Sequence, residues 1–139
     1  MKKIITSLPQ LKKLAAWIAA RMTTGKEKKI GLSGPLGAGK TTLVKLIAKR
    51  LGINELVSSP TFVLMHEYHS SKISLTHIDL YRISSADRDT VREIAEIIDN
   101  AQYVAVEWPE RIPAIAAKLE KIYHLRMGES ENERIVEYK

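Results

Sequence analysis

The chain has 139 residues, no cysteine and a formal net charge of +6, from 22 lysine and arginine residues against 16 aspartate and glutamate residues. This length fits one domain over residues 1–139, and the lack of cysteine excludes disulfide bonds and thiolate metal sites. The longest apolar run near the N-terminus, residues 14–20, is far shorter than the ~20 residues that span a bilayer. We therefore expect a soluble, cytoplasmic protein without a membrane contact, whose positive charge suits polyanionic partners.

The first predicted element is an amphipathic helix that begins close to Ser7. Ser7 and Gln10 have the spacing of a capping box, and Pro9 is tolerated in the first helical turn. The apolar residues that follow at helical spacing are Leu8, Leu11, Leu14, Ile18 and Met22. They predict a surface helix with one buried face.

The next segment contains a complete phosphate-binding loop. Residues 34–41, GPLGAGKT, satisfy every fixed position of the pattern G-x-x-x-x-G-K-S/T. In this pattern backbone amides surround the phosphates, the lysine reaches the β- and γ-oxygens, and the hydroxyl ligates Mg²⁺. The apolar segment 30–32 precedes the loop and a helical pattern follows it as far as Gly52, an order that delivers phosphate to a helix N-terminus. The sequence therefore predicts binding of a nucleoside triphosphate.

The segment after the loop helix differs from the helical crossover of kinases. Residues 61–65 and 72–80 are rich in β-branched and aromatic side chains around a polar turn at residues 70–71, which favours two extended strands. The further predicted elements are a helix from Asp87 or Asp89, a buried strand at 103–106, a helix at 112–119 and a terminal hairpin of 121–127 and 134–138. We therefore predict an α/β protein with a P-loop NTPase-like three-layer fold. Its mixed, mainly parallel sheet would have an antiparallel hairpin portion and be flanked by helices.

Two carboxylates are candidates for the second group that a phosphate loop needs beside Mg²⁺. Such a carboxylate usually stands at the end of a buried strand, and both Asp79 and Glu107 follow apolar runs. Side chains two residues apart share a face of a strand, so His77 and Asp79 would point together, although His77 could also be an ordinary half-exposed strand histidine. His66 and His69 would point to opposite faces, which argues against a metal pair.

Three further features have both a functional and a plain structural interpretation. Residues 58–61 lie where many P-loop enzymes have a mobile segment that senses the γ-phosphate, but on the sequence alone a proline turn explains them better. Arg82 and Arg111 each follow a candidate carboxylate, and a positioned arginine accelerates phosphoryl transfer by on the order of 10³–10⁵. Each arginine could equally belong to a surface ion pair.

Four motifs, in this order and spacing, resemble those of the bacterial ATPases of tRNA threonylcarbamoyladenosine biosynthesis, the TsaE (formerly YjeE) family. The motifs are GPLGAGKTT at 34–42, SPTF at 59–62, HIDLYR at 77–82 and EWPE at 107–110. The first helix and the terminal hairpin fit the same family but add little to the match.

The resemblance implies a P-loop ATPase that binds and hydrolyses ATP with Mg²⁺ as an accessory subunit. Its partners would be the threonylcarbamoyl transferase TsaD and the inactive paralogue TsaB. Together they would form N6-threonylcarbamoyladenosine, t6A, at position 37 of tRNAs that read ANN codons. Hydrolysis would be weak in the chain alone and would reset the assembly between turnovers, and tRNA would be met through the complex.

By the same resemblance, Lys40, Asp79 and Glu107 are catalytic, and Thr41 and Glu107 hold Mg²⁺. The residues implied to contact the nucleotide are Gly34, Leu36, Gly37, Ala38, Gly39, Lys40, Thr41, Thr42, Thr61 and Trp108. Trp108 could instead be a packing aromatic. Pro35, Glu93 and Leu11 depart from residues common in the family, which leaves the adenine contact and the partner-facing surface open.

Two other functions remain compatible with a phosphate loop. A small metabolite kinase would need an acceptor pocket and an arginine-bearing lid, and the sequence has no insertion of lid length. A nucleotide-dependent binding module would have negligible turnover. The products formed from ATP distinguish both from an ATPase.

Overall fold

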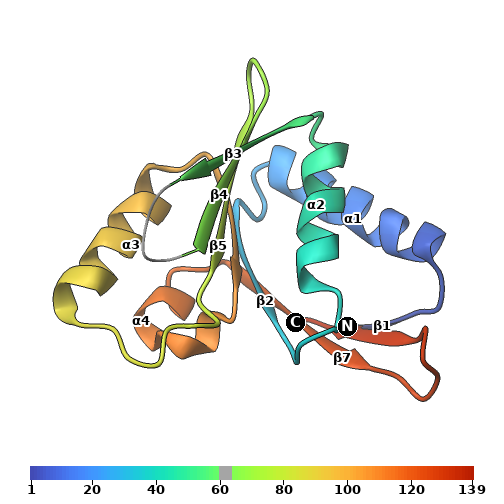
Figure 1. Ribbon diagram of the computed structural model, residues 1–139. Coiled ribbons are helices and arrows are strands. Elements are labelled where there is room, and N and C mark those ends of the chain that lie inside the picture. Colours follow the sequence, from blue (N-terminus) through green and yellow to red (C-terminus); the bar gives the residue numbers. More distant parts are fainter. Residues whose placement is uncertain (60–63) are drawn as a thin grey trace.

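The computed structural model describes residues 1–59 and 64–139, in which one mixed β-sheet has helices on both faces (Figure 1). The strands are β1 (Lys2–Ile5), β2 (Lys29–Ser33), β3 (Glu55–Ser59), β4 (Leu64–His69), β5 (Ser74–Asp79), β6 (Tyr103–Glu107), β7 (Lys121–Met127) and β8 (Arg134–Glu137). The helices are α1 (Leu8–Thr23), α2 (Lys40–Arg50), α3 (Arg88–Asn100) and α4 (Pro113–Ala116), with the 3₁₀ turn η1 (Pro109–Arg111). The described strands form an eight-stranded sheet in the order β1-β8-β7-β2-β6-β5-β4-β3.

Parallel and antiparallel pairing divide this sheet into a centre and two edges. The central strands β7, β2, β6 and β5 are parallel to one another, whereas β1 and β8 on one edge and β4 and β3 on the other pair antiparallel. This confirms the predicted α/β class with an antiparallel portion, and the terminal hairpin with β1 adds a second one. Because parallel strands end at the same edge of a sheet, the carboxyl ends of β2, β5 and β6 lie together.

Each face of the sheet has its own apolar core. α1 and α2 cover one face and α3 and α4 cover the other (Figure 1). Successive strand residues point to opposite faces, so in β6 Tyr103 and Ala105 pack on the α1/α2 side while Val104 and Val106 pack on the α3/α4 side. Glu107 follows this alternation and therefore lies on the same face as α2.

The first helix confirms the predicted cap and corrects one predicted core residue. The Ser7 hydroxyl accepts the N–H of Gln10 at 3.4 Å, and the Gln10 side chain accepts the N–H of Thr6 at 2.7 Å, one residue before the position expected in a capping box. The placement of Leu8 on the buried face is wrong. Leu8 is 53% exposed, because the first turn of α1 borders an open cavity instead of the core.

The sequence did not predict the two edge strands, β1 and β3. Short edge strands carry little alternation of their own, so pairing with β8 and with β4 decides their conformation. The two strands expected within residues 61–80 exist as β4 and β5, joined by a turn in which the N–H of Ser70 donates to the oxygen of Ile73 at 2.8 Å. Residues 58–59 belong to β3, and residues 60–63, with Thr61, lie outside the described part of the chain.

The later elements differ from prediction only in their ends. α3 uses Asp87 as its cap, since Oδ1 of Asp87 accepts an N–H of the first turn at 2.7 Å. The helix predicted at 112–119 ends at Ala116, because the chain turns and the N–H of Glu120 donates to the oxygen of Lys29 at 2.8 Å before β7 begins. Within the described residues, no helix is long and apolar enough to cross a bilayer.

Candidate functional site

The phosphate loop joins β2 to α2 and depends on glycine at two positions. Gly34 has a φ of 143°, and a β-carbon there would lie 2.0 Å from the backbone oxygen of Leu125. Gly39 caps α2 with a φ of 97°, and a β-carbon there would meet no atom within 4 Å. The loop is therefore packed against β7 on one side and open at the N-terminus of α2, where free backbone N–H groups attract anions.

Lys40 is the first residue of α2, and its ammonium group turns back toward the loop. Nζ donates to the backbone oxygens of Gly34 at 2.6 Å and Pro35 at 2.8 Å, and the residue is 5% exposed. Burial lowers the pKa of Lys40, while nearby carboxylates, chiefly Glu107, oppose the shift. An ammonium group surrounded by oxygen atoms in this way is suited to bind phosphate oxygens.

Glu107 connects the loop to the neighbouring strand β5. The Thr41 hydroxyl lies 2.9 Å from each carboxylate oxygen of Glu107 and donates to them. On the other side, Nε2 of His77 lies 2.6 Å from Oε2 of Glu107. His77 and Glu107 are each 3% exposed, so the interpretation of His77 as a half-exposed strand residue is wrong. The parallel pairing of β5 with β6 brings the two side chains together, which the sequence did not predict.

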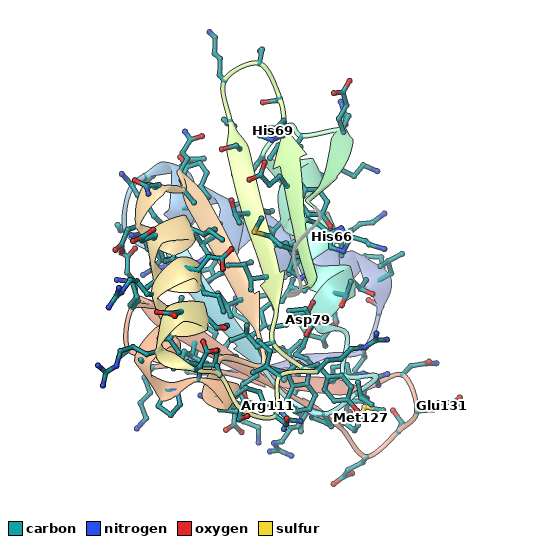
Figure 2. The ribbon with its side chains drawn as sticks, turned by 60° about the vertical axis from the view of Figure 1, so that its left-hand side comes forward. His66, His69, Asp79, Arg111, Met127 and Glu131 are labelled. Carbon is teal, nitrogen blue, oxygen red and sulfur yellow. The ribbon has the colours of Figure 1, made fainter. Side chains whose placement is uncertain are left out.

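Asp79 ends β5 and pairs with Glu107 in the parallel register. Its Oδ1 accepts the N–H of Tyr81 at 2.9 Å, so the turn after β5 fixes one carboxylate oxygen. Figure 2 shows Asp79 at the end of β5, with His66 and His69 progressively farther along β4. Both candidate carboxylates therefore lie at the same edge of the sheet, as the strand ends predict.

Trp108 follows β6 and is the one described residue other than glycine with a positive φ, 58°. Its backbone N–H donates to the backbone oxygen of Leu32 at 3.0 Å, which fixes the turn against the end of β2. The indole centroid lies 5.0 Å from the ring of Tyr81, 4.6 Å from Nζ of Lys40 and 5.3 Å from the guanidinium carbon of Arg111. Trp108 thus contacts the loop lysine directly, beyond its packing role.

These side chains line one cavity of about 270 Å³. The lining residues are Leu36, Gly37, Gly39, Lys40, Thr41, Thr42, Asp79, Tyr81, Glu107 and Trp108. The sequence named all of them as site residues except Tyr81, although Tyr81 belongs to the HIDLYR motif and lies two residues after Asp79. Of the other predicted residues, Gly34 and Ala38 belong to the loop beside this cavity, and Thr61 lies outside the described residues.

A second cavity of about 460 Å³ adjoins the first at the loop. Gly37, Gly39 and Thr42 line both cavities, and the second extends to Leu11 of α1 and Arg134 of β8. Nη2 of Arg134 donates to the backbone oxygen of Gly37 at 3.2 Å. The terminal hairpin therefore forms part of the wall of the site, which the sequence did not indicate.

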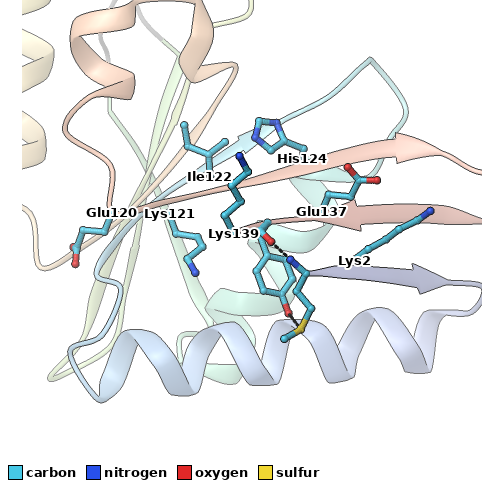
Figure 3. A pocket seen from close by; sticks show the side chains of 9 residues that line it. Lys2, Glu120, Lys121, Ile122, His124, Glu137 and Lys139 are labelled. Atoms are coloured by element: carbon cyan, nitrogen blue, oxygen red, sulfur yellow. Dashed lines mark hydrogen bonds between the residues drawn. The ribbon is translucent and has the colours of Figure 1, made fainter.

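A larger cavity of about 690 Å³ lies elsewhere, on β1, β7 and β8 (Figure 3). Its charged lining residues include Lys2, Lys121, Glu120 and Glu137. It contains none of the predicted site residues and no part of the phosphate loop. Size alone therefore does not identify the functional site, and the chemistry points to the smaller cavity.

The remaining candidates do not join the loop. His69 lies 3.1 Å from Glu67 on β4, and Arg82 is exposed. Across residues 1–59 and 64–139, no group of three or more His, Cys, Asp or Glu side chains could hold a metal ion. A divalent ion at Thr41 and Glu107 would therefore need further oxygen ligands from a nucleotide and from water, as is common for Mg²⁺.

The sequence profile of the family described as "Threonylcarbamoyl adenosine biosynthesis protein TsaE" matches residues 5–136, nearly the whole chain. The chain belongs to the TsaE family. A Nostoc relative named tRNA threonylcarbamoyladenosine biosynthesis protein TsaE is 47% identical over 87 residues, which cover 59% of this chain and 52% of the relative. A relative of the same name from Aquifex aeolicus is 46% identical over 110 residues, 78% of this chain and 76% of the relative. The family predicted from the four motifs is thus confirmed.

The chain spans only part of the length of some relatives: about half of the Nostoc protein and 57% of a Synechocystis relative. The crystal structure of YdiB from Bacillus subtilis aligns with a TM-score of 0.71 and 25% identity, over 99% of this chain and 83% of YdiB. The arrangement of helices around the mixed sheet is therefore shared with a solved structure.

Proposed function

We propose that this chain is an ATPase that binds ATP with Mg²⁺ and serves as an accessory subunit in forming t6A at position 37 of tRNAs that read ANN codons. The observation that carries the proposal is the meeting of Lys40, Thr41, Asp79 and Glu107 in one cavity at the N-terminus of α2. Membership of the TsaE family connects this cavity with t6A biosynthesis.

The cavity fits the phosphates of a nucleotide. A β-carbon at Gly37 or Gly39 would meet no atom beyond its adjoining residues within 4 Å, which leaves room for phosphate oxygens against the backbone. Nζ of Lys40 donates to two loop oxygens and has a third proton for a phosphate oxygen. The loop amides and Lys40 would thus bind the phosphates together.

Thr41 and Glu107 are oxygen ligands of the kind that Mg²⁺ prefers. The Thr41 hydroxyl donates its hydrogen bond to Glu107, so the lone pairs of its oxygen remain for another partner. When bound, the ion would neutralise the charge on the phosphate oxygens during phosphoryl transfer. The two residues would hold the ion directly or through water.

Asp79 is the residue that we assign to the attacking water. It lines the same cavity as Lys40 and Glu107, and one of its oxygens is fixed by the N–H of Tyr81. A carboxylate in this place can orient a water molecule or accept its proton. Glu107 would therefore hold the ion, and Asp79 would orient the attacking water or accept its proton.

The second cavity offers a place for the nucleoside part of ATP. It shares Gly37, Gly39 and Thr42 with the phosphate cavity, so one ligand can occupy both. Leu11 provides an apolar surface and Arg134 a cationic one. The adenine contact would thus come from α1 and from the terminal hairpin.

We further assign two partners, a TsaD-like threonylcarbamoyl transferase and its TsaB-like inactive paralogue, in the cytoplasm. The chain would meet tRNA through these partners. A catalytic site that is completed by a partner lacks part of its electrostatic stabilisation when alone. Slow turnover by the isolated chain is therefore expected, and faster turnover or tRNA modification when both partners are present.

Two measurements test the ATPase proposal: the products formed from ATP, and the effect of Lys40→Ala on nucleotide binding. We expect ADP and inorganic phosphate, and at least about tenfold weaker binding of a fluorescent ADP analogue, because the ammonium contacts the phosphates. Lys49→Ala, an exposed lysine of the same helix, is the matched control and should bind normally. A phosphorylated metabolite as product, or normal binding by Lys40→Ala, would contradict the proposal.

The accessory role needs a separate measurement. The two partner proteins, tRNA, ATP and a threonylcarbamoyl donor are combined with and without the chain, and t6A per tRNA is counted by mass spectrometry. We expect several turnovers only with the chain present. Repeated modification of tRNA in the absence of the chain would refute the role in t6A formation. The proposed ATPase activity would then be tested only by the measurements on ATP.

A further inference from the structure

His77 is a buried polar residue to which the proposed function gives no role. It belongs to the HIDLYR motif but lines neither cavity at the phosphate loop. Its Nε2 contacts Glu107, and Nδ1 has no hydrogen-bond partner among the residues that the structure describes. Within that part of the chain, the contact with Glu107 is therefore the ring's one hydrogen bond.

The geometry of this contact decides where the ring proton lies. Nε2 of His77 is 2.6 Å from Oε2 of Glu107, too close for two lone pairs to face each other. Nε2 therefore carries a proton and donates it to the carboxylate. Because both side chains are 3% exposed, water does not compete for this hydrogen bond, and low local polarity strengthens it.

The hydrogen bond from His77 orients Glu107 so that its carboxylate can accept a hydrogen bond from the Thr41 hydroxyl. The carboxylate, fixed at Oε2 by His77, accepts the Thr41 hydroxyl proton at 2.9 Å from both oxygens. A hydroxyl has one proton, so its lone pairs then face away from Glu107, and Thr41 lines the phosphate cavity. A line of contacts thus runs from the interior, through Glu107, to the cavity.

The surroundings explain why this fixation matters. The charge of Glu107 acts on Lys40, so a carboxylate released from His77 would be drawn toward the ammonium group and away from the Thr41 hydroxyl. The His77 ring is buried with the rings of Tyr68 and His66 as neighbours, at centroid distances of 6.2 Å and 6.0 Å. The donor and the carboxylate are therefore both fixed in the interior.

We propose that His77 is a positioning residue, which fixes Glu107 through Nε2–H and thereby aims the Thr41 oxygen and the carboxylate at a divalent cation. The inference rests on the proposed function, because it deepens the role of the same site. Loss of a residue that holds a metal ligand in place lowers metal affinity by ~10–100-fold. The same range is expected when His77 loses its donor.

The test compares three variants by their affinity for Mn²⁺, measured by electron paramagnetic resonance in the presence of ADP. His77→Leu keeps the bulk and removes the donor, and we expect its Mn²⁺ affinity to fall by ~10–100-fold. His77→Gln keeps an N–H donor near the Nε2 position and should recover most of the affinity. Thr76→Val, a buried residue on the opposite face of β5, is the matched control and should match the wild type.

Binding of ADP in the presence of a chelator distinguishes positioning from general damage. We expect all three variants to bind ADP without Mn²⁺ as the wild type does, because His77 touches neither cavity. Equal Mn²⁺ affinity in His77→Leu and wild type would overturn the positioning role alone. A wild type that binds no Mn²⁺ with ADP would overturn the proposed function together with it.

A second measurement locates the ring proton in the wild-type protein and uses variants only to assign the resonance. Nitrogen-15 spectra of the histidine side chains report which ring nitrogen is protonated. We expect a proton on Nε2 of His77, with a resonance that shifts in Glu107→Gln and stays unchanged in Thr76→Val. A ring with Nε2 bare would refute the hydrogen bond on which the inference depends.

Discussion

Glu27 and Glu107 are both buried carboxylates, each 3% exposed, but their neighbours differ. Glu27, in the turn between α1 and β2, accepts Nε of Arg21 at 2.8 Å and the hydroxyl of Tyr123 at 2.8 Å, and Nζ of Lys121 lies at 3.3 Å. Glu107 is bound by a threonine hydroxyl and a histidine. In the described part of the chain, no lysine or arginine forms an ion pair with Glu107.

The difference separates a carboxylate that cations of the protein neutralise from one that faces a cavity. Two cations of the protein neutralise Glu27, so it has no capacity for another. Glu107 is held in place by hydrogen bonds and opens onto a cavity, which leaves its charge available for a bound ion. Burial alone therefore says little about the role of a carboxylate, and the identity of its partners says more.

The largest expected effect is on hydrolysis by Glu107→Gln. If Glu107 holds the ion as proposed, we expect Mg²⁺-dependent ATP hydrolysis to fall by about 10²–10³, or roughly 3–4 kcal/mol of barrier, because the charge that would hold it is lost. Phosphate release measures the rate, and Glu27→Gln is the matched control, with the same change at the other buried site. Full activity in Glu107→Gln would move the metal-binding role to Asp79.

The next effect is on stability and involves the other carboxylate. Glu27→Gln leaves Arg21 and Lys121 without their counter-charge, and we expect a loss of about 3 kcal/mol in the free energy of unfolding. This is the low end of the range for a broken buried pair, because the Arg21 side chain is 28% exposed. Urea denaturation measures the change, with the exposed Glu131→Gln as control. If Glu27→Gln lowered the free energy of unfolding less than Glu107→Gln does, Glu27 would not be the carboxylate that matters more for stability.

The pH dependence of stability should also follow Glu27. Burial raises the pKa of Glu27, but hydrogen bonds from Arg21, Tyr123 and Lys121 outweigh it, and the folded-state pKa lies below the ordinary value. Such a group stabilises the fold above its unfolded-state pKa of ~4.3, and the contribution is lost as the pH falls through the folded-state value. Between roughly pH 5 and pH 3, unfolding free energy should therefore drop more steeply in wild type than in Glu27→Gln. Parallel curves would mean that Glu27 has no such pKa shift.

The smallest expected effect comes from Tyr123→Phe, which removes one donor from Glu27. Burial and the bond to Glu27 raise the pKa of Tyr123 far above its ordinary value, so the phenol remains a donor at any ordinary pH. We expect a loss of about 1.5 kcal/mol, less than for Glu27→Gln, because Arg21 and Lys121 still neutralise the carboxylate. Urea denaturation of both variants and their combination checks this. An equal loss in the two single variants would show that the phenol, and not the ion pairs, holds Glu27.

Much of the candidate site could be predicted from the sequence because its signals are local. The phosphate loop, the helix after it and the positions of Asp79 and Glu107 at strand ends follow from short patterns of glycine, lysine and apolar residues. The hydrogen-bonded turn at Ser70 and the cap at Asp87 are local in the same sense. These patterns also carried the resemblance to the TsaE family.

Other features had no local signal. β1 and β3 are strands because β8 and β4 pair with them, and Leu8 is exposed because α1 begins beside a cavity. Arg134 reaches the loop carbonyl of Gly37 across 97 positions of the chain. In each case the neighbour that decides the outcome lies far away in the sequence.

Local patterns in the sequence were enough to predict a phosphate loop, two candidate carboxylates and an α/β order of elements, because backbone conformation and apolar periodicity are short-range properties. The partner of each buried carboxylate depends instead on contacts between residues that are far apart in the sequence. Thr41 and Glu107 are 66 positions apart and Glu27 and Tyr123 are 96 apart, and strand pairing in the sheet brings them together. The neighbours of a buried carboxylate decide whether its charge is neutralised within the protein. Those neighbours are known only once the pairing of the strands is known.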